Sequence, residues 1–229
     1  MKYGEIICGR FSKRINRFIA EVFIDDVIER VHIKNTGRLK ELFRSDAEVL
    51  LERSNNPNRK TRFSLTAVEK NGRWVNIDSQ APNTVAFEAI KEGKISEFGM
   101  VQTIKREVKY GASRFDLYFE QDEKRGFIEV KGVTLEQDGV AMFPDAPTTR
   151  GTKHVLELAK AAQEGYVCAI LFIVQLKGCH VFIPNRKMDP AFADALIQAE
   201  QAGVNILAYD TIVTEEKLVL DHSIPVNLV

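Results

Sequence analysis

The sequence has few cysteines and no long apolar stretch. Its three cysteines, Cys8, Cys168 and Cys179, are far apart and form no C-x-x-C pair, which argues against a zinc ribbon or a redox motif. Their odd number, and a first segment without a signal-peptide core, indicate reduced thiols and a cytoplasmic location. The longest apolar run, Val167–Val174, is too short to cross a bilayer, so we expect no membrane partner. There is no glycine-rich phosphate loop, and we therefore expect no small-molecule cofactor.

The sequence also lacks a net charge. Its 32 lysine and arginine residues balance 32 aspartate and glutamate residues, so bulk charge gives no reason to expect a nucleic-acid partner. Within residues 1–80, however, 16 basic residues outnumber 11 acidic ones, and within 81–229 the numbers are 16 and 21. This asymmetry favours two domains with different tasks, although charges scattered over solvated faces would give the same counts.

Residues 1–80 contain short segments rich in β-branched and aromatic residues, separated by turn signals such as Asn71-Gly72. No convincing amphipathic helix interrupts them. Many short strands at close spacing are typical of a small barrel or sandwich, and at this length we expect an OB-like β-barrel. The strands are predicted at Tyr3–Phe11, Phe18–Ile24, Val27–Ile33, Glu48–Arg53, Arg62–Glu69 and Arg73–Ile77.

Basic residues gather around the turns of this predicted barrel. OB barrels bind nucleic acids with cations and stacked aromatic rings on one strand face and its flanking loops. Phe11, Phe18 and Phe63 lie among these charges, and they are either stacking rings of this kind or simply barrel core. The candidate DNA-binding residues of this half are Arg10, Lys13, Arg14, Arg17, Lys34, Arg38 and Arg62.

The second domain is predicted at residues 81–229. Pro82 marks its boundary, and Asn83-Thr84 can cap a helix that runs to about Phe98. The segment Val140–Thr149, which contains two prolines, is predicted to be a loop. Together these elements have the helix, three strands, helix, strand order of restriction-endonuclease-like folds, an α/β architecture with a mixed sheet and flanking helices. The other predicted strands are Thr103–Tyr110, Arg114–Glu120, Gly126–Val133, Val167–Val174, Cys179–Ile183, Val204–Tyr209 and Lys217–Leu220, and the other helices are Arg150–Gln163 and Pro190–Ala202.

The predicted strand Arg114–Glu120 alternates between apolar and polar residues. Phe115, Leu117 and Phe119 are expected on one face and Asp116 on the other, because side chains alternate along a strand. The polar segment that follows predicts a hairpin with the next strand.

That next strand, Gly126–Val133, is apolar except for two charged residues. Glu129 and Lys131 share a face because they are two residues apart, and buried charges are costly unless they are paired or coordinated. Opposed residues of a hairpin project to the same face, so Asp116 must lie opposite Glu129 or Lys131. We expect a tight turn for pairing with Lys131 and a longer loop for pairing with Glu129. A slip of one residue would put the carboxylates on opposite faces.

An aspartate on one strand and Glu-x-Lys on the next form the core of the PD-(D/E)xK nucleases. Two carboxylates can hold Mg²⁺ or Mn²⁺ through oxygen ligands, and the lysine can orient or deprotonate a water molecule. Taken alone, Glu-x-Lys is a weak signal, since an exposed Glu–Lys pair on an edge strand gives the same pattern. Its position in an apolar strand beside Asp116 favours a metal site, with Asp116 and Glu129 as ligands and Lys131 as their catalytic partner.

The helix after the predicted loop begins with basic side chains. Thr148 or Thr149 can cap it, and its first turn carries Arg150, Lys153 and His154. Cations at a helix N-terminus oppose the helix dipole unless an anion binds there, so we predict a phosphate site rather than a solvated cluster.

Several motifs together resemble the sugar fermentation stimulation protein A (SfsA) family, nearly from end to end. The resemblance implies an OB-like first domain, a nuclease-like second domain, and DNA binding with a regulatory role in sugar, notably maltose, metabolism. It also implies that Glu107 joins Asp116, Glu129 and Lys131 in a catalytic, metal-binding acidic site. The motifs are Asn35-Thr-Gly-Arg38, Glu107-Val-Lys-Tyr-Gly111, Arg114-Phe-Asp116, Ile128-Glu-Val-Lys131, Phe143-Pro-Asp-Ala146, Arg150-Gly-Thr-Lys-His154 and Gly203-Val-Asn-Ile-Leu-Ala-Tyr209.

Two functions compete for these residues. In the first, the protein binds double-stranded DNA non-specifically through the barrel and a nuclease-like cleft; in the second, it is a Mg²⁺-dependent nuclease that cuts the DNA. Fold analogy alone does not decide between them. The intact set of Asp116, Glu129 and Lys131 favours cleavage, because a pure binder has no obvious need for all three. We expect Arg150 and His154 to approach the same cleft.

Overall fold

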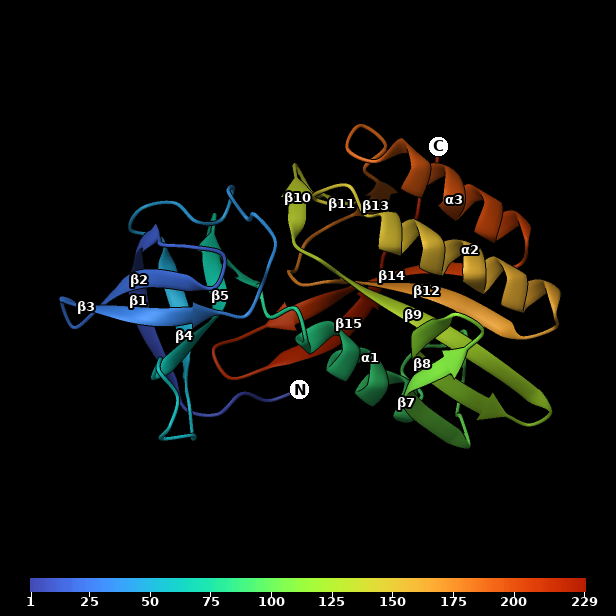
Figure 1. The fold of residues 1–229 in the computed structure, drawn as a ribbon, viewed down its shortest axis with the longest axis horizontal. Coiled ribbons are helices and arrows are strands. Elements are labelled where there is room, and N and C mark those ends of the chain that lie inside the picture. Colours follow the sequence, from blue (N-terminus) through green and yellow to red (C-terminus); the bar gives the residue numbers. More distant parts are fainter.

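The first six strands form one sheet that closes into a barrel (Figure 1). The computed structural model describes all residues 1–229. The strand order is β3-β2-β1-β4-β5-β6, and a short parallel pairing of β3 with β5 closes the first five strands. The predicted OB-like barrel is therefore confirmed. Its strands are β1 (Ile6–Arg14), β2 (Ile19–Ile24), β3 (Val27–Ile33), β4 (Glu48–Arg53), β5 (Phe63–Lys70) and β6 (Arg73–Asn76).

The three phenylalanines that lay among the basic residues have different environments. Phe11 and Phe63 are 2% and 3% exposed and belong to the barrel core, whereas Phe18 is 49% exposed. The guanidinium carbon of Arg17 lies 5.7 Å from the centroid of the Phe18 ring. Phe18 is therefore the one ring of the three that a nucleic-acid base could stack on.

The first helix, α1 (Ala81–Lys91), is shorter than predicted and starts earlier. Pro82 lies inside its first turn, where the missing proline N–H removes no hydrogen bond, so proline begins this helix instead of preceding it. The helix ends at Lys91, and Gly93 follows with φ +67°. Such a φ is accessible to glycine and stops the helix before Phe98.

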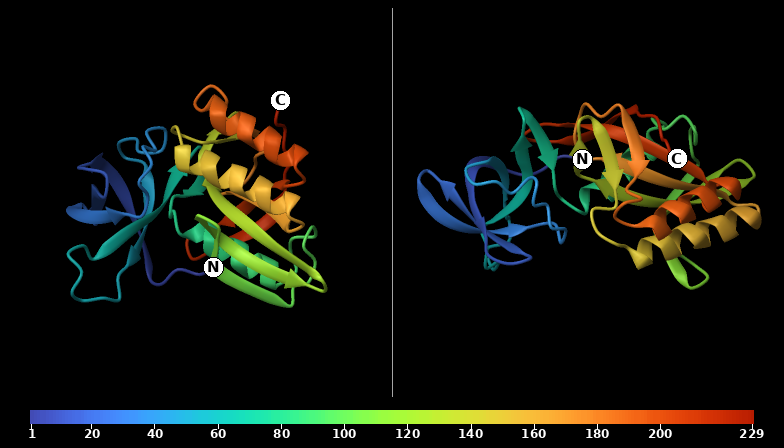
Figure 2. Two further views of the ribbon diagram at one scale, coloured as in Figure 1. Left: turned by 45° about the vertical axis from the view of Figure 1, so that its right-hand side comes forward. Right: turned by 90° about the horizontal axis from the view of Figure 1, so that it is seen from above.

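A six-stranded mixed sheet forms the second domain, with helices on both faces (Figures 1 and 2). The central strands β9, β12 and β14 are parallel, and β15, β8 and β7 extend the sheet antiparallel on its two sides. This confirms the predicted fold class. The strands are β7 (Thr103–Tyr110), β8 (Ser113–Gln121), β9 (Lys124–Val133), β12 (Val167–Val174), β14 (Asn205–Val213) and β15 (Leu218–Ser223), and the other helices are α2 (Thr149–Gln163) and α3 (Pro190–Gln201).

Two hydrophobic layers sandwich this sheet. On one face α1 buries Val85 and Ile90 against residues that include Ile128 and Leu171. On the other face α2 and α3 pack over Ile170 and Phe172, and this second layer is continuous with the barrel core. Because β12 is covered on both faces, its sequence is an uninterrupted apolar run. None of the three helices combines the length and the apolar character needed to span a membrane.

The segment predicted as a loop contains a strand. Two strands, β10 (Leu135–Gln137) and β11 (Val140–Phe143), form a hairpin. The second of them, β11, pairs in parallel with β13 (Val181–Pro184). Asp138 and Gly139 make the two-residue turn with φ values of +51° and +80°. An Asp-Gly pair favours this turn because both residues tolerate positive φ, and that signal could have identified the hairpin from the sequence.

The β8–β9 hairpin has the register that pairs Leu117 with Ile128 and Gln121 with Lys124. Continued by one residue, this register sets Asp116 opposite Glu129, one of the two predicted partners. The prediction of a longer loop for this pairing was wrong, since only Asp122 and Glu123 lie between the paired ends. Asp122 has φ +52°, so a tight turn closes the hairpin.

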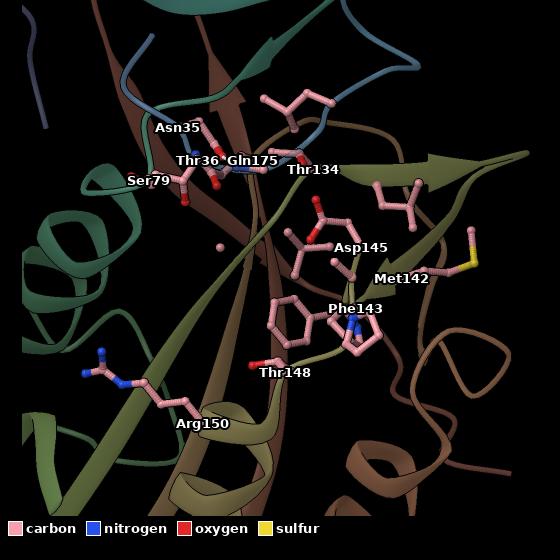
Figure 3. Close-up of a pocket in the computed structure, with 18 of the residues that line it drawn as sticks. Asn35, Thr36, Ser79, Thr134, Met142, Phe143, Asp145, Thr148, Arg150 and Gln175 are labelled. Atoms are coloured by element: carbon pink, nitrogen blue, oxygen red, sulfur yellow. Dashed lines mark hydrogen bonds between the residues drawn. The ribbon is translucent and has the colours of Figure 1, made fainter. Parts of the chain in front are cut away.

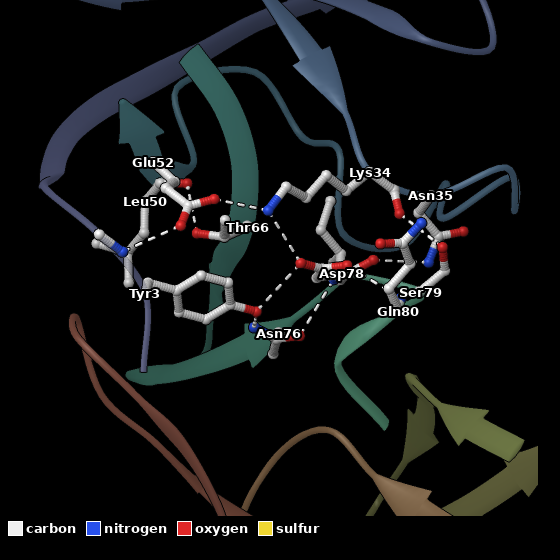
Figure 4. Close-up of polar contacts among 12 residues, drawn as sticks. Tyr3, Lys34, Asn35, Leu50, Glu52, Thr66, Asn76, Asp78, Ser79 and Gln80 are labelled. Atoms are coloured by element: carbon white, nitrogen blue, oxygen red, sulfur yellow. Dashed lines mark hydrogen bonds and ion pairs between the residues drawn. The ribbon is translucent and has the colours of Figure 1, made fainter. Parts of the chain in front are cut away.

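A buried polar network joins the barrel to the second domain, and Figure 4 shows its barrel side around Lys34 and Asp78. Gln175, directly after β12, donates from Nε2 to Asn76 Oδ1 at 2.8 Å and to the Asp78 carbonyl at 3.1 Å. Lys34 Nζ lies 2.6 Å from Glu52 and 3.2 Å from Asp78, whose side chain is 2% exposed. The Gln175 bonds attach the barrel to the end of the central strand, whereas the Lys34 ion pairs lie within residues 1–80.

The chain passes between the two domains twice. Residues 1–3, predicted within the barrel domain, pair with the second domain: Lys2 bridges Lys217, and the Tyr3 N–H donates to the Glu216 carbonyl at 2.9 Å. The chain then forms the barrel and returns at α1.

Candidate metal centre beside the interdomain cleft

The acidic site lies where β8 and β9 separate. Their last paired residues are Leu117 and Ile128, so the backbone of Val130 has no partner on β8. Asp116 fills this place: its carboxylate accepts from the Val130 N–H at 2.8 Å and from Asn83 Nδ2 at 2.9 Å. Two hydrogen bonds from different elements therefore hold the aspartate at the free edge of β9.

The strand twists at the same point, which changes where Phe115 packs. Leu117 and Phe119 join the α1 layer as expected, but Phe115 joins the α2 layer, with its ring centroid 5.3 Å from that of Phe127 and 6.4 Å from that of His154. The prediction that Phe115 shares a face with Leu117 was therefore wrong. Regular alternation fails here because the ladder ends and the chain bends.

Glu129 is the most buried charged group of the site, at 2% exposure. Its Oε1 lies 2.5 Å from Lys131 Nζ and 2.6 Å from His154 Nδ1. Its Oε2 is buried and has no hydrogen-bond partner in the protein. A buried carboxylate oxygen without a partner is costly, so this atom is suited to an external ligand.

The pKa values of Asp116 and Glu129 are shifted in opposite directions. Burial and the nearby charge of Glu129 raise the pKa of Asp116 above the usual aspartate value, against the hydrogen bonds from Val130 and Asn83. Burial also acts to raise the pKa of Glu129, but the bonds and charges of His154 and Lys131 outweigh it and lower that pKa. Glu129 is thus held ionised, while Asp116 gains most from a cation close by.

These residues fit a divalent cation. Asp116 and Glu129 supply hard oxygen ligands, and the unpartnered Oε2 of Glu129 is the atom that a cation would satisfy. Lys131 and His154 both bond the opposite oxygen, Oε1, and so leave Oε2 free. Glu107 lines the same cavity from β7, but it is exposed and ion-paired with Arg114 at 3.3 Å.

A small cavity of about 220 Å³ contains the predicted acidic residues. Asp116, Glu129, Lys131 and Glu107 line it together, as the strand pattern predicted, and Arg150 and His154 reach it from α2. The expected cap of α2 is Thr148, whose hydroxyl accepts from the Gly151 N–H at 3.0 Å. The structure thus brings these residues together, while their catalytic and ligand roles stay predictions.

A larger cavity of about 600 Å³ lies between the two domains (Figure 3). The barrel contributes the 35–39 loop and Arg17, and the second domain contributes the 142–148 segment and the end of β9. Ser79 and Arg150 line both this cavity and the acidic one. The acidic site is therefore one end of an interdomain cleft.

Most of the predicted DNA-binding cations are occupied within the protein. Arg10 pairs with Asp26 and Asp46, Lys13 with Glu21, Arg62 with Glu29 and Lys153 with Glu157, and the pairs of Lys34 and His154 are described above. Arg14 donates to four backbone carbonyls at residues 16, 17, 37 and 38.

Three predicted cations, Arg17, Arg38 and Arg150, have no carboxylate or carbonyl partner. Arg17 and Arg150 line the interdomain cavity, and Arg38 directly follows the cavity residue Gly37. Of the predicted DNA-binding cations, those without a carboxylate or carbonyl partner therefore lie around the cleft. The sequence could not show this, because pairing depends on contacts between distant residues.

Sequence reasoning missed Asn83 and Ser79, which line the acidic cavity. No local pattern identifies them, since their role depends on the packing of α1 and of the linker before it.

Sequence reasoning also missed a second cluster, in which ligand atoms of Asp210, Asp221 and His222 lie within 4.8 Å of one another. The Lys177 ammonium bonds both aspartates there, so a cation of the protein already occupies the cluster.

Affinity for Mn²⁺ should fall on acidification at a higher pH than for an ordinary aspartate site. Asp116 must lose its proton to bind a cation, and its folded-state pKa is raised, so protons compete from higher pH downward. Asn83→Ala should move this loss still higher, because the Asn83 bond lowers the pKa. Calorimetry from about pH 4 to pH 8 measures the midpoint. Asn58→Ala, in an exposed barrel loop, is the control, and an equal shift in both variants would contradict the assignment.

The comparisons with known proteins cover the chain almost completely. The model of the "SfsA N-terminal OB domain" matches residues 13–77, and that of the "Sugar fermentation stimulation protein RE domain" matches residues 80–217. A sugar fermentation stimulation protein homolog of Alkaliphilus oremlandii is 50% identical over 232 residues, or 99% of each chain. One of Desulfitobacterium hafniense (strain Y51) is 48% identical over 229 residues, covering 100% of this chain and 99% of the relative.

A solved structure agrees in fold. "The structure of Pyrococcus Furiosus SfsA in complex with Ca2+" superposes with a TM-score of 0.90 at 32% identity, covering 99% of this chain and 98% of that one. Barrel, mixed sheet and their arrangement are therefore shared. With matches to both domains and relatives of about half-identical sequence over the full length, the chain belongs to the sugar fermentation stimulation protein (SfsA) family.

Proposed function

We propose that this protein binds DNA in the interdomain cleft and hydrolyses its phosphodiester bonds with Mg²⁺ or Mn²⁺ at Asp116 and Glu129. The observation that carries the proposal is the buried Oε2 of Glu129, which has no partner in the protein although Lys131 and His154 both bond Oε1. The solved Pyrococcus furiosus relative is described as a Ca²⁺ complex, which supports a divalent cation in this family.

Each residue of the site has a chemical task in this proposal. When bound, the divalent ion supplies charge stabilisation at the phosphate oxygens and makes a bound water more acidic. Asp116 and Glu129 hold the ion, and His154 fixes the orientation of the Glu129 carboxylate. Lys131 stands beside the same carboxylate, where its ammonium can orient the attacking water. Arg150, unpaired and at the mouth of the cavity, can bind the phosphate.

Binding without cleavage is the second candidate, and one contact favours it. Lys131 Nζ and His154 Nδ1 both occupy Glu129 Oε1, so that oxygen is already satisfied without a metal. A DNA-binding regulator of sugar, notably maltose, metabolism would need only the cleft and its cations. Purified protein incubated with plasmid, linear and single-stranded DNA, with and without Mg²⁺ or Mn²⁺, separates the candidates. Metal-dependent cleavage supports hydrolysis; binding with no cleavage under any of these conditions supports the regulator.

DNA binding should be non-specific and should weaken as salt rises. Each protein cation that contacts a phosphate releases counterions, so the slope of log affinity against log salt should become shallower by about 0.9 for each contact removed from duplex DNA. We expect this change for Arg17→Ala and for Arg150→Ala, because both arginines are unpaired in the cleft. Lys13→Ala, which removes a cation paired with Glu21, should leave the slope nearly unchanged. Fluorescence anisotropy across a salt series measures it, and a slope near zero for the unmodified protein would refute phosphate-driven binding.

A further inference from the structure

The cavity between the domains carries more than phosphate-binding charge. Arg17 of the barrel and Arg150 of α2 both line it, together with the end of β9. Figure 3 shows Arg150 beside the start of α2. The β9 edge is unpaired beyond Ile128, because β8 has diverged. A linear polymer lying along this edge would pass from the interdomain cavity to the acidic site.

A carboxylate without a partner lines the same cavity. Asp145 comes from the segment before α2; it is exposed to solvent and has no hydrogen-bond or ion-pair partner in the protein. Its Oδ2 lies so close to Gly37 of the barrel loop that a Cβ on that glycine would be 2.9 Å away. An unpaired carboxylate repels a phosphate, but it accepts hydrogen bonds from the amino groups of bases. The middle of the cavity is therefore suited to a base, and its two ends to phosphates.

The other groups around Asp145 agree with a base. Figure 3 shows Asp145 and Phe143 near the middle of the lining, with Thr36 and Gln175 across from them. Phe143 packs against Phe172 and Phe192 at centroid distances of 5.6 and 5.2 Å and also lines the cavity, so the part of its ring that faces the cavity is where a base could stack. The volume of about 600 Å³ is in the range of small-molecule pockets, whereas a base pair inside a duplex presents only its edges.

We propose that the interdomain cavity binds a base of an unpaired DNA strand, with Asp145 accepting from its amino group, so that the acidic site acts on single strands and single-stranded ends. This rests on the proposed function, because it names the form of DNA that reaches the acidic site. Duplex DNA can still bind the outer surface through phosphate contacts, but its paired bases do not enter the cavity.

The test compares single-stranded, blunt duplex and overhang-bearing DNA of one sequence, with binding measured without metal and cleavage measured with Mn²⁺. We expect single strands and overhangs to bind about tenfold tighter than blunt duplex, and cleavage to be confined to unpaired nucleotides. Asp145→Ala should remove this preference and leave duplex affinity unchanged. Asp138→Ala, which removes an exposed carboxylate from the β10–β11 turn, should change neither.

A second measurement uses the unmodified protein and therefore does not depend on how a variant folds. Cytosine carries an amino group, whereas the one donor of the thymine edge is flanked by two carbonyl oxygens that a carboxylate repels. Oligocytidine should therefore bind tighter than oligothymidine, and Asp145→Ala should abolish the difference. Equal affinities for single strand and duplex, or for the two oligonucleotides, would overturn the inference while leaving the proposed function standing. Failure to bind any DNA at low salt would instead remove the proposed function itself.

Discussion

Glu129→Gln is expected to lower metal-dependent cleavage by more than about 100-fold, because it removes a charged ligand from the cation. The glutamine amide keeps the shape of the side chain. It loses the charge that pairs with Lys131 and His154, and it offers a cation at most one neutral oxygen. Cleavage rates of a single-stranded oligonucleotide in Mn²⁺ measure the effect, and calorimetry should show that Mn²⁺ binding is lost as well.

The control is Glu123→Gln in the exposed turn between β8 and β9, which removes the same charge from the same hairpin. It should cleave at the unmodified rate. DNA binding without metal should survive Glu129→Gln, because the cleft cations are untouched. Cleavage that persists in Glu129→Gln at a rate near that of Glu123→Gln would show that the reaction is catalysed elsewhere.

Lys34→Ala is expected to destabilise the fold by about 3 kcal/mol, because it leaves two partly or fully buried carboxylates without a counter-charge. The Lys34 ammonium lies between Glu52 and Asp78, whose side chains are 23% and 2% exposed. Lys13→Ala also breaks an ion pair, but Lys13 is 65% exposed, so its loss should cost less than about 1 kcal/mol. Urea unfolding at neutral pH measures both differences.

Lowering the pH should reduce the loss in free energy of unfolding that Lys34→Ala causes. In the unmodified protein burial tends to raise the pKa of Glu52, but the bonds and charge of Gly4 and Lys34 lower it overall. That group therefore stabilises the fold above its unfolded pKa, and the stabilisation is lost as pH falls through the lower folded pKa. Without Lys34 the Glu52 carboxylate takes up its proton at higher pH, which relieves its repulsion with Asp78. A defect that stays constant from neutral pH down to about pH 4 would indicate a cause other than charge.

The approach of Glu129 and Lys131 to one site could be predicted because it depends only on the two-residue period of a strand. Asp116 lies one residue beyond the paired part of the hairpin, so the register indicated its position opposite Glu129 but not its bond to the Val130 N–H. The hydrogen bond between Glu129 and His154 could not be predicted in this way, because it depends on how α2 packs over the sheet. Phe115 was misplaced for a related reason: alternation predicts a face only while the ladder continues, and the ladder ends at Leu117.

The partners of the predicted DNA-binding cations could not be predicted from the sequence. Arg14 and Arg17 look alike in the sequence, yet Arg14 holds four backbone carbonyls of the barrel loops and Arg17 faces the cleft. Lys34, also predicted to contact DNA, is ion-paired with Glu52 and Asp78 in the structure, and its contact with DNA stays a prediction. A basic residue near a turn therefore predicts a surface position, while its partner is decided by folding.

The two passages of the chain between the domains have a mechanical consequence. A domain held by one linker can swing in any direction, but the barrel is attached at residues 1–3 and again before α1. Two attachment points define an axis, and the least restrained motion of the barrel is a rotation about the line that joins them. The interdomain cavity lies between the two bodies that such rocking would move, and its width is the quantity that the rotation changes. The hydrogen bonds of Gln175 with Asn76 and Asp78 then hold the barrel at one angle to the second domain.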